Sequence, residues 1–330
     1  ERILEVIRAG FPDAAILAEE SGAHGGRGGT RFIVDPLDGT RGFSRGGAAM
    51  IVTEPISMAR HQNVSYRARA WNDENLEGLK RWADAVESED CRLLGQIQDP
   101  GRGRHNTGIG TDAIGASALA DDLSWIVPHA LTPAEIRSMI EEFASSAARL
   151  QRCGFSGVEI SAGHGHLFHQ FMSAWSNVRT DEFGGDLEGR TRIVTELIAA
   201  LRSACGRQFI VGLKLPGDDF VAGGIDAAEA GRNATLLTRG RAVDYVCFSQ
   251  GTHGLALERH LPDSHVPRLP YLALTRSLRS SLNGVPLIAL GDEESDLGLT
   301  AHHEAPTSRH QASMVPRPPN TSDPGVMPEK

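Results

Sequence analysis

The sequence predicts an α/β fold in which short parallel strands alternate with helices. Six short apolar runs recur through the middle of the chain, and most lack the polar alternation of a strand with one wet face. Helical patterns separate the runs, and polar residues gather where several of them end. The expected strands are Met50–Thr53, Leu93–Ile97, Gly157–Ser161, Phe209–Leu215, Val243–Ser249 and Pro286–Leu290.

The clearest helix is expected over Pro133–Cys153. Thr132 is a suitable N-cap, Pro133 fits the first helical position and Glu135 completes a capping box. Gly154 stands where a left-handed residue commonly follows a helix. An apolar stripe at helical spacing supports the assignment and comprises Ile136, Met139, Ile140, Phe143, Ala147 and Leu150.

A second capped helix is expected before the strand that begins at Val243. Asp226 and Glu229 have the spacing of a capping box, and the apolar pair Leu236–Leu237 follows them. This helix would connect the fifth visible strand to its predecessor, as in a repeated strand–helix unit.

Strand–helix alternation produces either an open doubly wound sheet or a closed barrel, and six visible strands do not decide between them. Polar residues stand at the carboxyl ends of the strands: Gln96, Ser161 to His166, Lys214, and Ser249 to His253. In a barrel these ends converge on one mouth, where active sites are built, whereas an open sheet spreads them along an edge. We therefore predict a (β/α)8 TIM barrel.

Composition narrows the classes of partner. The chain has 330 residues and a formal net charge of −9, without the basic cluster that nucleic acid or an anionic membrane requires. We expect a cytoplasmic protein that acts on a small-molecule substrate. The four cysteines form no CxxC pair, so the sequence predicts buried free thiols rather than a zinc or iron–sulfur site.

Two adjacent segments carry a family resemblance. Residues 157–171 read GVEISAGHGHLFHQF, and residues 176–190 read SNVRTDEFGGDLEGR. The first resembles the fourth-strand motif of the Old Yellow Enzyme (NADH:flavin oxidoreductase) family, and the second resembles the loop that follows it. The resemblance extends over about 47–291. It implies an FMN-linked TIM barrel that takes hydride from NAD(P)H and passes it to an activated alkene or related substrate.

The resemblance assigns cofactor-binding roles to several residues. Gln96 matches the glutamine at the flavin pyrimidine edge, and Lys214 matches the cation near flavin N1 and O2. A cation suits that position because reduced flavin is negatively charged there. Ser161 replaces the first member of the family's substrate-binding pair and can donate one weaker hydrogen bond. Gly291 ends the matched region, next to the place where the family holds the FMN phosphate.

Three histidines are the catalytic candidates. His164 matches the second member of the pair that binds the substrate carbonyl oxygen. His166 stands at the position of the family's tyrosine proton donor, and histidine can act as a general acid near neutral pH. His253 resembles a histidine of the dienoyl-CoA reductases. The rival interpretation is that each is a structural or solvated histidine.

The ends of the chain depart from the family pattern. Nothing in 1–46 resembles the first barrel strand, and Asp292-Glu293-Glu294 follow Gly291 where the eighth strand and the phosphate site are expected. We expect an incomplete barrel that could pair its open edges in a homo-oligomer. Three units result: 1–46, the partial barrel 47–291, and a tail 292–330 that is poor in apolar periodicity.

The first unit carries a different resemblance. Residues 16–22 (ILAEESG) and 32–40 (FIVDPLDGT) resemble the metal-binding core of the inositol monophosphatase family. The carboxylates of Glu19, Asp35 and Asp38 would then be hard oxygen ligands for Mg²⁺. A Mg²⁺-dependent phosphomonoesterase is thus one alternative to the flavin enzyme. A non-catalytic remnant of a fused gene is another.

Overall fold

A computed structural model describes residues 49–62, 67–104, 113–121, 125–260 and 271–288, together with the backbone of three short strands at 15–18, 22–24 and 31–34. These three strands, β1 (Ala15–Ala18), β2 (Gly22–His24) and β3 (Arg31–Val34), form a sheet of their own in the order β2-β1-β3. The predicted tail 292–330 lies outside the described residues. The predicted unit boundaries remain predictions.

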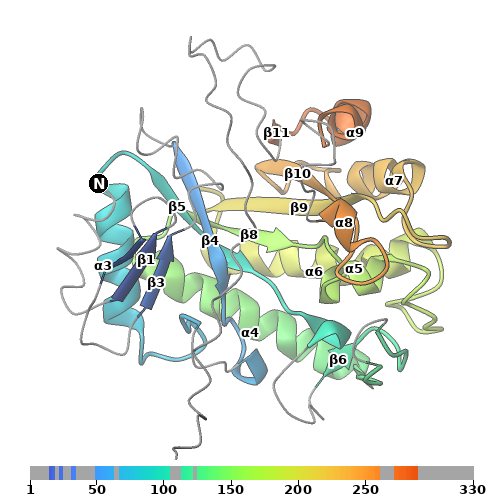
Figure 1. Cartoon of the computed structure of the whole chain (residues 1–330), viewed down its shortest axis with the longest axis horizontal. Coiled ribbons are helices and arrows are strands. Elements are labelled where there is room, and N and C mark those ends of the chain that lie inside the picture. Colours follow the sequence, from blue (N-terminus) through green and yellow to red (C-terminus); the bar gives the residue numbers. More distant parts are fainter. Residues whose placement is uncertain are drawn as a thin grey trace, which may run out of the picture.

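The main sheet has six strands, all parallel, in the order β11-β10-β9-β8-β5-β4. Each expected strand is present, with ends shifted by a few residues. Among the described strands, β4 and β11 form the two edges of the sheet (Figure 1). The strands are β4 (Met50–Ile56), β5 (Arg92–Ile97), β8 (Gly157–Ser161), β9 (Ile210–Asp218), β10 (Tyr245–Gln250) and β11 (Leu287–Ile288).

The main helices pack in a row against one face of this sheet, each beside the next (Figure 1). Shorter elements lie in the loops at the carboxyl ends of the strands. The row comprises α3 (Leu76–Glu87), α4 (Pro133–Arg152), α6 (Leu187–Cys205), α7 (Ala227–Leu237) and α9 (Leu272–Leu278); the loop elements include β6 (Ile114–Gly115), β7 (His129–Ala130), α5 (Leu167–Met172) and α8 (Leu257–His260).

The two faces of the sheet differ in chemistry, because successive side chains of a strand point to opposite faces. The helix-facing side chains, among them Val158, Ile160, Leu213 and Phe248, are buried in the large hydrophobic core. The opposite side, which we call the inner face, carries the alternate residues Leu94, Gln96, Glu159, Ser161, Lys214, Tyr245 and Cys247. The polar residues of the sheet therefore collect on its inner face.

The capping predictions are confirmed for α4 and partly wrong for α7. Thr132 and Glu135 form both hydrogen bonds of the capping box, and Gly154, with φ of 97°, ends α4. In α7 the Asp226 side chain accepts from the Glu229 N–H at 2.7 Å. The Glu229 carboxylate, however, binds Arg190 at 2.6 Å instead of returning to the N-cap. An ion pair with α6 thus replaces half of the predicted box.

All four cysteines are free and buried, as predicted. Within the described ranges, no helix is long and apolar enough to cross a lipid bilayer.

Candidate functional site

A buried carboxylate is the centre of the polar group on the inner face. Glu159 lies in the middle of β8 and is 3% exposed. Its Oε1 atom lies 3.1 Å from Lys214 Nζ on β9 and accepts a 3.2 Å hydrogen bond from Gln96 Nε2 on β5. Its Oε2 atom accepts from the Tyr245 hydroxyl at 2.9 Å. One carboxylate therefore connects β5, β8, β9 and β10.

The neighbours of Glu159 reflect its negative charge. Burial raises the pKa of the Tyr245 phenol, and the Glu159 carboxylate raises it further. The pKa of the Cys247 thiol, 3.6 Å from Glu159 Oε2, is likewise raised, first by burial and then by Glu159. Both groups remain neutral donors. Because Glu159 has a cation and three neutral donors against it, its charge is tolerated in the interior.

Tyr245 occupies space that a glycine on β9 leaves open. A Cβ atom at Gly212 would lie 2.1 Å from the Tyr245 ring. The absence of a side chain at Gly212 therefore permits the phenol to cross the inner face and reach Glu159.

The turn after β8 carries two of the predicted catalytic histidines. His164 and Gly165 adopt left-handed backbone conformations, with φ of 60° and 82°. The turn lies close to the loop after β10, where the His253 N–H donates to the His164 carbonyl at 3.1 Å. Gly163 allows this approach, since a Cβ atom there would lie 2.1 Å from Ser249 Oγ.

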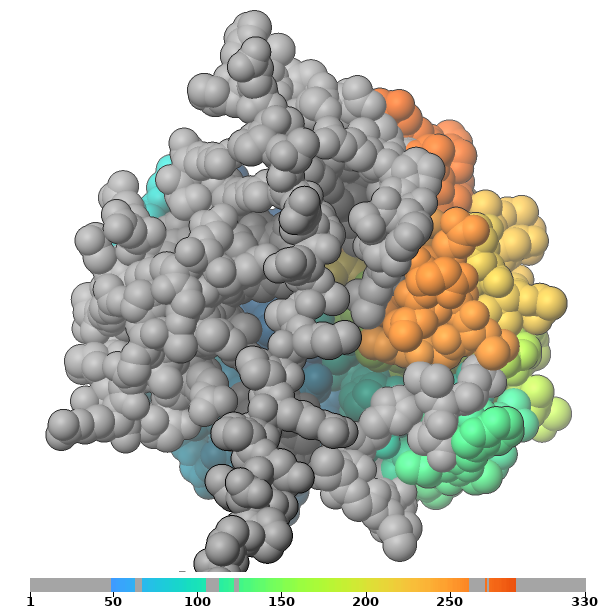
Figure 2. All heavy atoms as spheres, viewed as in Figure 1, coloured from blue at the N-terminus to red at the C-terminus, as the bar shows by residue number. Residues whose placement is uncertain are grey.

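Four imidazole rings meet at the carboxyl ends of β8 and β10. The ring centroids are 4.8 Å apart for His166 and His253, and 4.6 Å apart for His253 and His260. His260 also lies 3.9 Å from His164, which closes the group. His260, at the end of α8, was not predicted. His253 is exposed, and Figure 2 shows the orange segment around residue 255 at the molecular surface.

The cluster favours neutral imidazoles. Burial lowers the pKa of His164 and His166 well below the ordinary histidine value, and the neighbouring histidines lower it further. Burial and then His253 lower the pKa of His260 to about 4. The charge of Lys214 contributes to the shifts of His164 and His260, so the histidine cluster and the inner-face group act on each other electrostatically.

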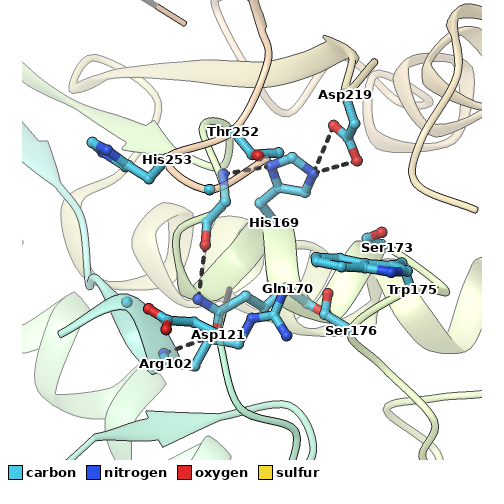
Figure 3. Close-up of a pocket in the computed structure, with 13 residues that line it drawn as sticks. Arg102, Asp121, His169, Gln170, Ser173, Trp175, Ser176, Asp219, Thr252 and His253 are labelled. Carbon is cyan, nitrogen blue, oxygen red and sulfur yellow. Dashed lines mark hydrogen bonds and ion pairs between the residues drawn. The ribbon is translucent and has the colours of Figure 1, made fainter. Parts of the chain in front are cut away.

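A buried pair, His169 and Asp219, holds the turn after β8 in place (Figure 3). His169 Nδ1 accepts a hydrogen bond from the Gly165 N–H at 2.8 Å, so the imidazole proton is on Nε2. His169 Nε2 lies 3.0 Å from Asp219 Oδ2 and donates to it. Asp219 Oδ2 also accepts from the Ile225 N–H at 2.8 Å. Both side chains are almost fully buried. His169 therefore has a structural role in positioning the residues between His164 and His166.

A small pocket adjoins this pair (Figure 3). Its wall includes the Arg102 guanidinium, which lies 4.6 Å from the centre of the Trp175 ring. The buried Ser173 Oγ, on the same wall, makes no hydrogen bond within the described part of the protein. An ordered water would satisfy such a hydroxyl.

Among the residues that the structure describes, the predicted flavin-binding and catalytic side chains form two groups. Gln96 and Lys214 meet at Glu159, while His164, His166 and His253 form the histidine cluster. Ser161 is buried and pairs in register with Lys214. Gly291, Glu19, Asp35 and Asp38 lie outside the described residues. In the part that is described, no group of three or more His, Cys, Asp or Glu side chains could hold a metal ion.

The histidine cluster predicts a dependence of stability on pH. An unfolded chain protonates His260 near its ordinary pKa of 6.5, whereas the folded chain does so only near 4. Between these values the unfolded state binds more protons, so the free energy of unfolding should fall as the pH falls. His260→Gln should make this decline shallower, by up to about 1.4 kcal/mol per pH unit. Denaturant titrations across this range measure both slopes, and parallel curves would contradict the assignment.

Comparison with known proteins identifies the family of this chain. Residues 41–296 match the NADH:flavin oxidoreductase / NADH oxidase family. The chain belongs to this family. A metal reductase of Desulforamulus reducens is 32% identical over 248 residues, which are 74% of this chain and 36% of that protein. An NADH oxidase of Thermoanaerobacter brockii is 28% identical over 252 residues, or 75% of this chain and 38% of that one. The chain thus spans little more than a third of these two relatives.

Solved structures of this flavin oxidoreductase family share the fold. Morphinone reductase in complex with tetrahydroNAD superposes with a TM-score of 0.60 at 26% identity, over 75% of this chain and 69% of that one. Histamine dehydrogenase from Rhizobium sp. 4-9 gives a TM-score of 0.68 at 25% identity, over 77% and 37%. The predicted TIM-barrel class is confirmed. Residues 1–53 also match the inositol monophosphatase family, as the sequence indicated.

Proposed function

We propose that this chain is an FMN-dependent oxidoreductase that moves hydride from NAD(P)H to a small substrate with an activated double bond. The observation that carries the proposal is the junction of two groups at one end of the sheet. Donors for a flavin, Gln96 on β5 and Lys214 on β9, share one carboxylate on the inner face. The three candidate catalytic histidines follow the carboxyl ends of β8 and β10, the neighbours of β9 in the same sheet. Active sites of barrels are built at these ends.

The residues present fit the pyrimidine edge of FMN. Lys214 is held on the inner face by Glu159, with its side chain 16% exposed. Gln96 directs its Nε2 to Glu159, which leaves its carbonyl oxygen as an acceptor for an imide N–H. FMN, when bound, supplies reversible two-electron hydride chemistry. The residues expected at its phosphate, from Gly291 onward, lie outside the described part of the chain.

The histidine cluster is suited to a substrate oxygen. Neutral imidazoles at His164 and His166 can each donate one N–H to a carbonyl oxygen without the cost of a buried charge. As negative charge develops on that oxygen, it would raise the pKa of the nearest ring and favour proton uptake there. His253 is exposed and its ring centroid lies 4.8 Å from that of the buried His166, so it would connect His166 with water as a source of the proton. These roles follow the pattern of general acid catalysis.

The test separates the two half-reactions. The FMN-loaded protein is mixed without oxygen with NADH or NADPH, and loss of the flavin absorbance reports reduction. Cyclohexenone, a small cyclic enone, is then added and reoxidation is followed. His166→Phe should leave reduction unchanged and slow reoxidation by about a hundredfold or more.

A matched control is His129→Gln, which removes an exposed imidazole bound to Glu135, far along the chain from the cluster. Both half-reactions should keep their wild-type rates. Failure of NADH and of NADPH to bleach the bound flavin would refute the proposed function. Equal reoxidation rates in wild type and His166→Phe would refute the role of His166 alone.

A further inference from the structure

Glu159 has a position that no flavin-binding role explains. It lies one strand away from Gln96 and from Lys214, and its Oε1 atom contacts both side chains, at 3.2 Å and 3.1 Å. Its two sequence neighbours point into the helix-covered core, so Glu159 alone of the three presents its side chain to the inner face. Burying an ionised acid between two apolar residues costs folding free energy unless its charge is paired and hydrogen-bonded.

The charge arrangement has a direct electrostatic consequence. Lys214 would supply the positive charge at the flavin edge that becomes negative on reduction. Glu159 places a negative charge 3.1 Å from that ammonium group, so the pair together is close to neutral. Charges this close interact strongly where solvent is largely excluded. The carboxylate therefore weakens the preference of the site for reduced over oxidised flavin.

We propose that Glu159 is a positioning residue that fixes Lys214 and Gln96 at the flavin edge and lowers the flavin midpoint potential by compensating the charge of Lys214. This inference rests on the proposed function. It assigns a role to a residue that would not itself touch the flavin, acting through Lys214. The electrons still pass from NAD(P)H to the flavin and on to the substrate; Glu159 changes how readily the flavin accepts them.

The test compares midpoint potentials of the FMN-loaded wild type and Glu159→Gln. Glutamine keeps an acceptor for Lys214 and removes the negative charge. We expect reduced FMN to gain about tenfold in binding relative to oxidised FMN, which corresponds to a rise of about 30 mV for a two-electron couple. An unchanged or lower potential would overturn the proposal. If the variant loses FMN on desalting, dissociation constants measured separately for oxidised and reduced FMN give the same ratio.

A further variant separates a charge effect from a packing effect. Tyr245→Phe removes a hydrogen bond to Glu159 Oε2 but keeps the Glu159 carboxylate and its Lys214 contact, so the potential should not rise. A rise in Tyr245→Phe equal to that in Glu159→Gln would overturn the proposal.

Failure of the inference can be told apart from failure of the function. A wild-type protein that binds no FMN would refute both the proposed function and the role of Glu159. A wild type that binds FMN and is bleached by NAD(P)H, with equal potentials in wild type and Glu159→Gln, removes only the role of Glu159.

Discussion

Lys214→Met is expected to lower the free energy of unfolding by about 3 kcal/mol. The substitution removes the cation that compensates Glu159, whose side chain is 4% exposed. The Tyr245 and Gln96 hydrogen bonds remain, but they do not cancel the charge. An uncompensated buried carboxylate is the costly state, and methionine refills most of the lysine volume, so a cavity contributes little. Urea titration at neutral pH measures the loss.

The double variant Lys214→Met/Glu159→Gln is the matched control. It removes both charges and keeps hydrogen-bonding groups near Gln96 and Tyr245, so it should regain more than half of the lost stability. Glu159→Gln alone should cost less than Lys214→Met, because the lysine side chain is the more exposed partner. Strictly additive single and double variants would show that the two charges do not interact.

Gly212→Ala is expected to cost about 3 kcal/mol, at the upper end of the range for overpacked interiors. The new methyl group would lie 2.1 Å from a carbon of the Tyr245 ring and 2.3 Å from its hydroxyl oxygen. The ring is buried and its hydroxyl is bound to Glu159, so it cannot move aside without breaking that hydrogen bond. Thermal or denaturant unfolding of the variant measures the cost.

Two comparisons isolate this clash. In a Tyr245→Ala background the ring is absent, and Gly212→Ala should become nearly neutral. Gly78→Ala, on α3, meets no atom within 4 Å and should stabilise the helix by up to about 1 kcal/mol. A similar cost for Gly212→Ala with and without the Tyr245 ring would refute the steric explanation.

Periodicity and capping residues predicted the main sheet and its clearest helix, because those signals are local. The Thr132 capping box and the apolar strands are properties of adjacent residues, and the structure confirms them. The half-formed box at Asp226 shows the limit of such reasoning. Glu229 meets Arg190 of another helix, and nothing in the local pattern indicates that partner.

The candidate site was predicted in part for the same reason. Lys214 was identified from its match to the family's flavin-edge cation and from its position at the carboxyl end of an apolar strand. Glu159 carries a local signal too, because an ionised side chain between Val158 and Ile160 is costly to bury without a partner, and that signal would have identified it. His260 carried no such signal: its helix has four residues, and its proximity to His164 depends on how two loops fold. The pair of His169 and Asp219 is similarly separated along the chain.

The absorption spectrum of the purified protein, recorded after incubation with FMN and desalting, tests the central claim most directly. If the inner-face group around Glu159 and the histidine cluster form a flavin site, the wild type should retain the visible flavin bands and lose them when NAD(P)H is added. Lys214→Met should retain less flavin at the same protein concentration. A folded wild type that emerges colourless would contradict the account.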